Sequence, residues 1–128
     1  MAQWQMWNEN PSGRAVGDCA VRAVSVALDV DWDTAYSLIA AKGYQLKDMP
    51  SSNAIFGAVL RDNGFSRHAV PDSCPDCFTV GDFADANPRG VFVVLTGGHV
   101  VTIRDGTVYD SWNSLNEIPQ FYWTKEAR

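Results

Sequence analysis

Three residues of the types used in nucleophilic catalysis stand where folding could bring them together. Cys19 opens an apolar run, His99 follows a Gly-Gly pair, and Asp110 lies on the predicted partner strand of the His99 segment. A thiolate can attack a carbonyl carbon, an imidazole can move the protons, and a carboxylate can orient the imidazole and stabilise its charge. A cysteine thiol has an ordinary pKa of about 8.5, and both a helix N-terminus and a nearby imidazolium favour its anion. The sequence therefore predicts a nucleophilic cysteine site made of Cys19, His99 and Asp110.

Helices are predicted in the first half of the chain, where apolar residues recur at helical spacing. The three predicted segments are residues 19–28, 32–41 and 52–62. Asp18 precedes the first, where its carboxylate could accept an unpaired backbone N–H as a cap. Gly43 is expected to end the second helix. The nucleophile is thus expected at the first residue of a helix.

The second half is expected to be mainly strands. Apolar or alternating patterns predict strands over residues 2–7, 65–70, 91–96, 99–104, 107–112 and 120–124, with a brief helix from about Thr79 to before Pro88. Asp105-Gly106 between two of these strands is a hairpin signal. Helices followed by paired strands predict an α+β fold, with N-terminal helices packed on an antiparallel sheet and residues 1–128 forming a single domain.

The turn decides which side chains share a face. If Asp105-Gly106 forms a two-residue turn, His99 lies opposite Trp112 and diagonal to Asp110, at about 7 Å between backbone positions. Trp112 would then shield the bond between imidazole and carboxylate from water. A three-residue turn would set Asn113 opposite His99 and move Asp110 to the other face. Asp-Gly favours the shorter turn, and hence Asp110 as the third member.

These residues resemble the papain-like cysteine peptidases. Asp110-Ser111-Trp112 is similar to the family's Asn-Ser-Trp with Asp for Asn, and Gly17-Asp18-Cys19 is similar to its Gly-x-Cys segment. The Asp variant resembles the smaller bacteriocin-processing peptidases, and the chain is similar in style to small papain-fold proteins of phages and bacteria. The resemblance implies a papain-like fold and a cysteine peptidase, or a related amide or isopeptide hydrolase. It also implies a protein or peptide substrate and no cofactor.

The oxyanion donors are predicted from the residues around the nucleophile. The backbone N–H of Cys19 is one expected donor, and a side-chain amide from Asn8 or Asn10 is the expected second. The family usually has a glutamine about six residues before the nucleophile, and this chain has Gly13 there. That departure favours a second hypothesis, in which the fold is a catalytically inactive protein-binding module, such as a phage factor that acts on a host protein.

Other polar residues receive simpler interpretations. Cys74 and Cys77 are predicted to be loop cysteines, because a single Cys-x-x-Cys pair with His68 falls short of four zinc ligands. A zinc site and a redox motif are the less favoured alternatives, so no metal site is predicted. Arg14 and Arg22 are expected at solvated surface positions, with binding of an acidic group as the alternative.

Charge and hydropathy exclude two classes of partner. The chain has 128 residues, a formal net charge of -5 and no cluster of Lys and Arg, which argues against nucleic acid. Its longest apolar run, residues 91–95, is far shorter than a membrane span, and the N-terminus lacks a basic segment followed by an apolar one. We therefore expect no membrane partner and a cytoplasmic location, the host cytoplasm if a phage encodes the chain. The oligomeric state is left open.

Overall fold

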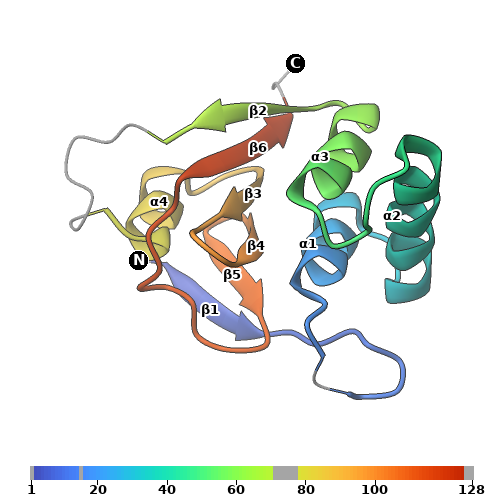
Figure 1. The fold of residues 1–128 in the computed structure, drawn as a ribbon. Helices are drawn as coiled ribbons and strands as arrows, with labels where there is room; N and C mark the ends of the chain where they lie inside the picture. Colours follow the sequence, from blue (N-terminus) through green and yellow to red (C-terminus); the bar gives the residue numbers. More distant parts are fainter. Residues whose placement is uncertain (1, 15, 71–77, 126–128) are drawn as a thin grey trace.

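The computed structural model describes residues 2–14, 16–70 and 78–125, which form an α+β fold (Figure 1). The helices in these ranges are α1 (Cys19–Leu28), α2 (Trp32–Leu46), α3 (Asn53–Asp62) and α4 (Val80–Ala86). The strands are β1 (Gln3–Met6), β2 (Phe65–Ala69), β3 (Val91–Leu95), β4 (Val100–Arg104), β5 (Thr107–Asp110) and β6 (Phe121–Lys125). Cys19 is the first residue of α1, as predicted.

The six strands make one mixed sheet in the order β1-β5-β4-β3-β6-β2. Every neighbouring pair is antiparallel except β1 with β5, which is parallel. The expectation of a wholly antiparallel sheet was therefore wrong for this pair. Alternation in the sequence marks β1 as a strand, but no short turn joins it to β5, so nothing local fixes its direction.

The sheet is covered on both faces. One core lies between α1–α3 and one face and includes Val24, Phe56 and Val93. The other lies against α4 on the opposite face and includes Phe83 and Val94. Figure 1 shows α1, α2 and α3 grouped on one side of the strands and α4 on the other. Because successive strand residues point to opposite faces, covering both explains why β3 is apolar throughout.

The second helix is longer than predicted. It passes through Gly43 and ends at Leu46, and the next residue, Lys47, has left-handed φ and ψ of 58° and 43°. Gly43 is buried inside the helix, and a Cβ atom there would lie 2.9 Å from the backbone oxygen of Asp48. The glycine therefore permits the chain after α2 to approach the helix closely, and the prediction that it ends the helix was wrong.

The hairpin of β4 and β5 has the predicted two-residue turn. Asp105 and Gly106 have φ values of 50° and 80°, which fit a type I′ turn. Arg104 pairs with Thr107, and the register continues to the pair of Thr102 with Tyr109. This register brings the start of β4, which His99 precedes, and the end of β5, where Asp110 lies, to the same end of the hairpin.

In the parts of the chain that the structure describes, no helix combines the length and the apolar character needed to cross a membrane.

Replacing Gly106 by alanine should weaken the hairpin. At a φ of 80° a Cβ atom is strained, so we expect Gly106→Ala to lower the free energy of unfolding by about 1–2 kcal/mol. Gly98→Ala is the matched control, because nothing lies within 4 Å of its added Cβ and its φ is outside the left-handed region. Urea unfolding followed by tryptophan fluorescence measures both. Equal effects of the two substitutions would contradict the assigned turn.

Candidate active site

The imidazole of His99 and the carboxylate of Asp110 form a short hydrogen bond. His99 Nε2 lies 2.6 Å from Asp110 Oδ2. Asp110 ends β5, and His99 precedes β4 in a turn where its carbonyl oxygen accepts from the Thr96 N–H at 2.8 Å and the Thr96 hydroxyl at 3.1 Å. The structure therefore brings together these two predicted residues, at the place where the two-residue turn puts them.

Cys19 is the third residue at this place. Its thiol is half-buried, and the side chain of His99 is the main cause that lowers the pKa of Cys19. Burial acts in the opposite direction, while the backbone of Val100 and the charges of His99 and Arg22 lower the pKa further. Because Nε2 of His99 faces Asp110, Nδ1 is the ring nitrogen left for the sulfur. The structure thus brings the thiol of Cys19, the imidazole of His99 and the carboxylate of Asp110 to one place.

Asp110 is only 1% exposed and accepts four hydrogen bonds. Oδ2 accepts from His99 and from the Ser114 hydroxyl at 2.7 Å. Oδ1 accepts from the Ser111 N–H at 2.7 Å and from Arg22 Nη2 at 3.3 Å. Burial alone would raise the pKa of Asp110, but the hydrogen bonds from His99 and Ser114 outweigh it and lower the pKa. The carboxylate is therefore ionised at neutral pH.

The surroundings of His99 favour its charged form. Burial lowers the pKa of the imidazole, but hydrogen bonds with Asp110 and Cys19, and the charges of these groups, raise it to about 9. Since the pKa of Cys19 is lowered and that of His99 is raised, a pH range exists in which the sulfur is an anion and the imidazole a cation. The geometry supports a thiolate–imidazolium pair.

Arg22 is a member of the site that the sequence analysis placed on the surface. It is 7% exposed and joins two carboxylates, those of Asp18 and Asp110. The expectation of a solvated position was wrong for Arg22, whereas Arg14 is exposed as expected. Two features of the sequence indicate that Arg22 is buried. It stands inside the apolar run of α1, and an aspartate stands four residues earlier, within reach of its side chain.

Asp18 does not cap α1. Its φ of -107° and ψ of 27° are not the extended conformation of a capping residue, and its side chain makes no cap hydrogen bond. The carboxylate instead accepts from Arg22 and, at 2.9 Å, from Trp32 Nε1. The predicted cap was therefore wrong, because Asp18 neutralises Arg22 instead.

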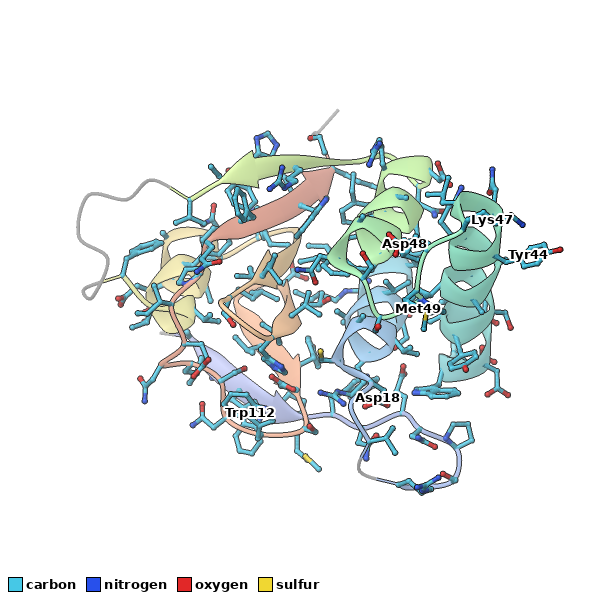
Figure 2. All side chains as sticks on the ribbon, in the orientation of Figure 1. Asp18, Tyr44, Lys47, Asp48, Met49 and Trp112 are labelled. Atoms are coloured by element: carbon cyan, nitrogen blue, oxygen red, sulfur yellow. The ribbon has the colours of Figure 1, made fainter. Side chains whose placement is uncertain are left out.

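Trp112 lies against the imidazole. The ring centroids of His99 and Trp112 are 4.8 Å apart with an interplanar angle of 41°. Trp112 is 43% exposed, and Figure 2 shows it on the segment that follows β5. One face of the imidazole is therefore covered by an indole ring, which is the position expected of a shielding residue.

Asn8 and Asn10 lie in the segment that leads to α1. Asn8 Nδ2 donates to the carbonyl oxygen of Arg14 at 3.4 Å, and Asn10 Oδ1 accepts from the N–H and hydroxyl of Ser12 at 2.9 and 2.7 Å. Asn10 and Asp18 also line a cavity of about 570 Å³ beside the start of α1. No hydrogen bond among the described residues joins either amide to Cys19, and the oxyanion role stays a prediction.

The remaining predicted groups are Cys74, Cys77 and His68. Cys74 and Cys77 fall outside the described residues. His68 is on β2, where its ring stacks on Tyr122 with centroids 5.0 Å apart. Within the described ranges, no three His, Cys, Asp or Glu side chains are grouped so that they could hold a metal ion.

Comparisons with protein families, with curated proteins and with solved structures found no match to this chain. The chemistry of the site is therefore inferred from its geometry.

Cys19 should react with iodoacetamide at low pH because of His99. Below the thiol pKa, each unit by which the pKa is lowered raises the thiolate fraction about tenfold. We expect His99→Gln, which cannot carry the charge, to slow alkylation of Cys19 at pH 6. Peptide mass spectrometry reads Cys19 separately from Cys74 and Cys77. His68→Gln, at the other histidine of the chain, should leave the rate unchanged, and equal rates for His99→Gln and the unmodified protein would contradict the ion pair.

Removing Arg22 should destabilise the protein, because it leaves two buried carboxylates without their shared cation. We expect Arg22→Met to lower the free energy of unfolding by about 3–5 kcal/mol, and Arg22→Lys to lower it by less. Arg89→Met, at an exposed arginine, should change it by no more than about 0.5 kcal/mol. Urea denaturation measures these values. A loss for Arg22→Met as small as for Arg89→Met would show that the guanidinium is not needed there.

Proposed function

We propose that the chain is a cysteine peptidase, or a related amide or isopeptide hydrolase, with Cys19 as nucleophile. The observation that carries this proposal is the placement of His99, whose Nε2 lies 2.6 Å from a buried carboxylate and whose side chain lowers the pKa of the Cys19 thiol. A papain-like architecture is supported by the order Cys, His, Asp along the chain and by a nucleophile that begins a helix packed on the sheet.

In the first half of the reaction, the Cys19 thiolate attacks the carbonyl carbon of the substrate. A C–S bond forms and the carbonyl π electrons move to oxygen, giving a tetrahedral oxyanion. The oxyanion then re-forms the carbonyl as the C–N bond breaks, and the His99 imidazolium gives its proton to the leaving nitrogen. An amine leaves, and the acyl group stays on sulfur as a thioester beside a neutral imidazole.

In the second half, water attacks the thioester. His99 takes a proton from the water as the C–O bond forms, and the C–S bond then breaks with its electrons returning to sulfur. The products are a carboxylic acid and the original thiolate–imidazolium pair. Every proton taken up or released in the cycle passes through His99. The pKa of this imidazole therefore determines the pH range in which the reaction can proceed.

The surrounding residues hold these groups ready. Asp110 stays ionised, holds Nε2–H and stabilises the imidazolium, so that Nδ1 is directed at the sulfur. The backbone N–H of Cys19 has no acceptor within α1, because the first N–H groups of a helix lack intrahelical partners. That N–H is the proposed first donor to the oxyanion.

One observation favours the alternative of a protein-binding module that does not cleave its partner. Gly13 stands at the position of the family's oxyanion glutamine, and the Asn8 amide donates to a carbonyl of its own loop. Without a second donor, the thiolate would be formed but the oxyanion would be weakly stabilised. Hydrolysis assays therefore separate the two functions.

Hydrolysis should depend on Cys19 and should fall at high pH. On a pool of fluorogenic peptides we expect Cys19→Ala to lower kcat by a factor of about 10⁴ or more, while Cys74→Ser and Cys77→Ser remain active. Since the reaction needs the imidazolium, kcat/KM should decline as pH rises through the His99 pKa of about 9.

Equal hydrolysis by Cys19→Ala and the unmodified protein would remove Cys19 from the mechanism. Peptide binding without hydrolysis by either protein would support the binding module instead.

A further inference from the structure

A cavity of about 750 Å³ lies between α3 and the strands β2 and β6. One end of its lining is Leu95 and Gln120, whose backbones are joined by a hydrogen bond from the Gln120 N–H to the Leu95 carbonyl at 2.8 Å. Leu95 ends β3 directly before the turn that carries His99, and it pairs with Val100 on β4. The end of the cavity is therefore one strand away from Val100, whose backbone helps to lower the pKa of the Cys19 thiol.

The cavity and the nucleophile lie on the same face of the sheet. Cys19, Leu95 and Phe121 all pack against the core cluster that contains Val100 and Trp123. Leu95, Phe121 and Trp123 also line the cavity. The Leu95 end of the cavity therefore lies toward the end of the sheet where His99 precedes β4, and a polypeptide bound at Cys19 would pass along this end to reach it.

The charged residues in the described lining of this cavity are both arginines. Arg61 lies in the last turn of α3 and Arg67 lies on β2, and both are exposed. The Arg67 guanidinium sits over the Phe121 ring, 4.0 Å from its centroid. This contact fixes the guanidinium against the wall of the cavity.

Neither arginine is neutralised within the described part of the chain. The ion pairs there join Arg22 to Asp18 and Asp110, His99 to Asp110, and Lys42 to Asp62. Asp62, the neighbour of Arg61 in sequence, thus pairs with a lysine of α2. The forked N–H donors of both guanidinium groups match a carboxylate.

We propose that this cavity binds a carboxylate of the substrate polypeptide, so that the site prefers chains with an acidic group near the bond presented to Cys19. The aromatic rings of Phe65, Phe121 and Trp123 in the lining would contact the aliphatic part of the bound residue. Arg61 and Arg67 would bind its carboxylate. The carboxylate can come from a Glu or Asp side chain or from a chain end, and the chemistry of recognition is the same. This inference rests on the proposed function, because it assumes that Cys19 receives a polypeptide.

The test measures binding to the Cys19→Ala protein, so that it does not depend on hydrolysis. The probes are fluorescein-labelled alanine-based decapeptides with one Glu placed in turn at each position, matched peptides with Gln or Lys, and each peptide with a free or an amidated C-terminus. Fluorescence anisotropy at 0.15 M salt gives the Kd. We expect the best Glu peptide to bind roughly tenfold more tightly than its Gln partner.

Charge reversal on the protein provides the matched control. Arg67→Glu should lose the preference for Glu and favour the Lys peptide, and Arg61→Glu should act in the same direction. Arg89→Glu, an equal change of net charge at an exposed residue before β3, should leave the preference unchanged. If only a free C-terminus gives the tighter binding, and Arg67→Glu removes that gain, the carboxylate is a chain end.

Equal binding of Glu, Gln and amidated peptides would overturn the proposal, and so would equal effects of Arg89→Glu and Arg67→Glu. These failures differ from failure of the proposed function. Hydrolysis of the peptides without a charge preference would contradict carboxylate binding in the cavity and support the proposed hydrolase function. A charge preference without hydrolysis by the unmodified protein would contradict the proposed hydrolase function and support carboxylate binding in the cavity.

Discussion

A buried carboxylate is stable only when its oxygens are fully hydrogen-bonded, and Asp110 imposes this constraint on the protein. Its side chain draws donors from α1, from the turn before β4 and from the segment after β5. Its backbone carbonyl oxygen also accepts from the N–H of Trp7 at 2.7 Å and from Trp4 Nε1 at 3.1 Å, both in the β1 region. One residue therefore connects four segments that are distant in sequence.

The same bonds set the chemistry of the thiol. The hydrogen bond between Asp110 and His99 also raises the pKa of the imidazole and so favours its protonated form. The charge of His99 in turn lowers the pKa of Cys19 and favours the thiolate. The hydroxyl of Thr102 donates to the Ala23 carbonyl at 2.6 Å, which fastens α1 to β4 and so fixes sulfur against imidazole. Apolar residues of similar volume could fill such a region at lower cost in desolvation. A buried cluster of charges is therefore better explained by reactivity than by stability.

Local patterns predicted the parts of this structure that local physics decides. The start of α1, the Asp-Gly turn and its register follow from spacing and backbone preference, and these place Cys19, His99 and Asp110. The direction of β1 and the burial of Arg22 depend on contacts across the fold that spacing does not encode. Gly43 was misinterpreted for the same reason, since its lack of a side chain serves the approach of Asp48 rather than the end of a helix.

The spacing at the start of α1 places Cys19, the proposed nucleophile, beside charged residues. Residues three and four apart lie on one helix face, so Asp18, Cys19 and Arg22 are presented together. Oδ2 of Asp110 binds His99 and Oδ1 binds Arg22, which gives each cation its own oxygen. Because the pKa of Asp110 is lowered by folding, the stability that this carboxylate contributes is present above its unfolded pKa and is lost as pH falls through the lower, folded value. Protonation of Asp110 would therefore weaken its ion pairs with His99 and Arg22 together, while Asp18 would still hold Arg22.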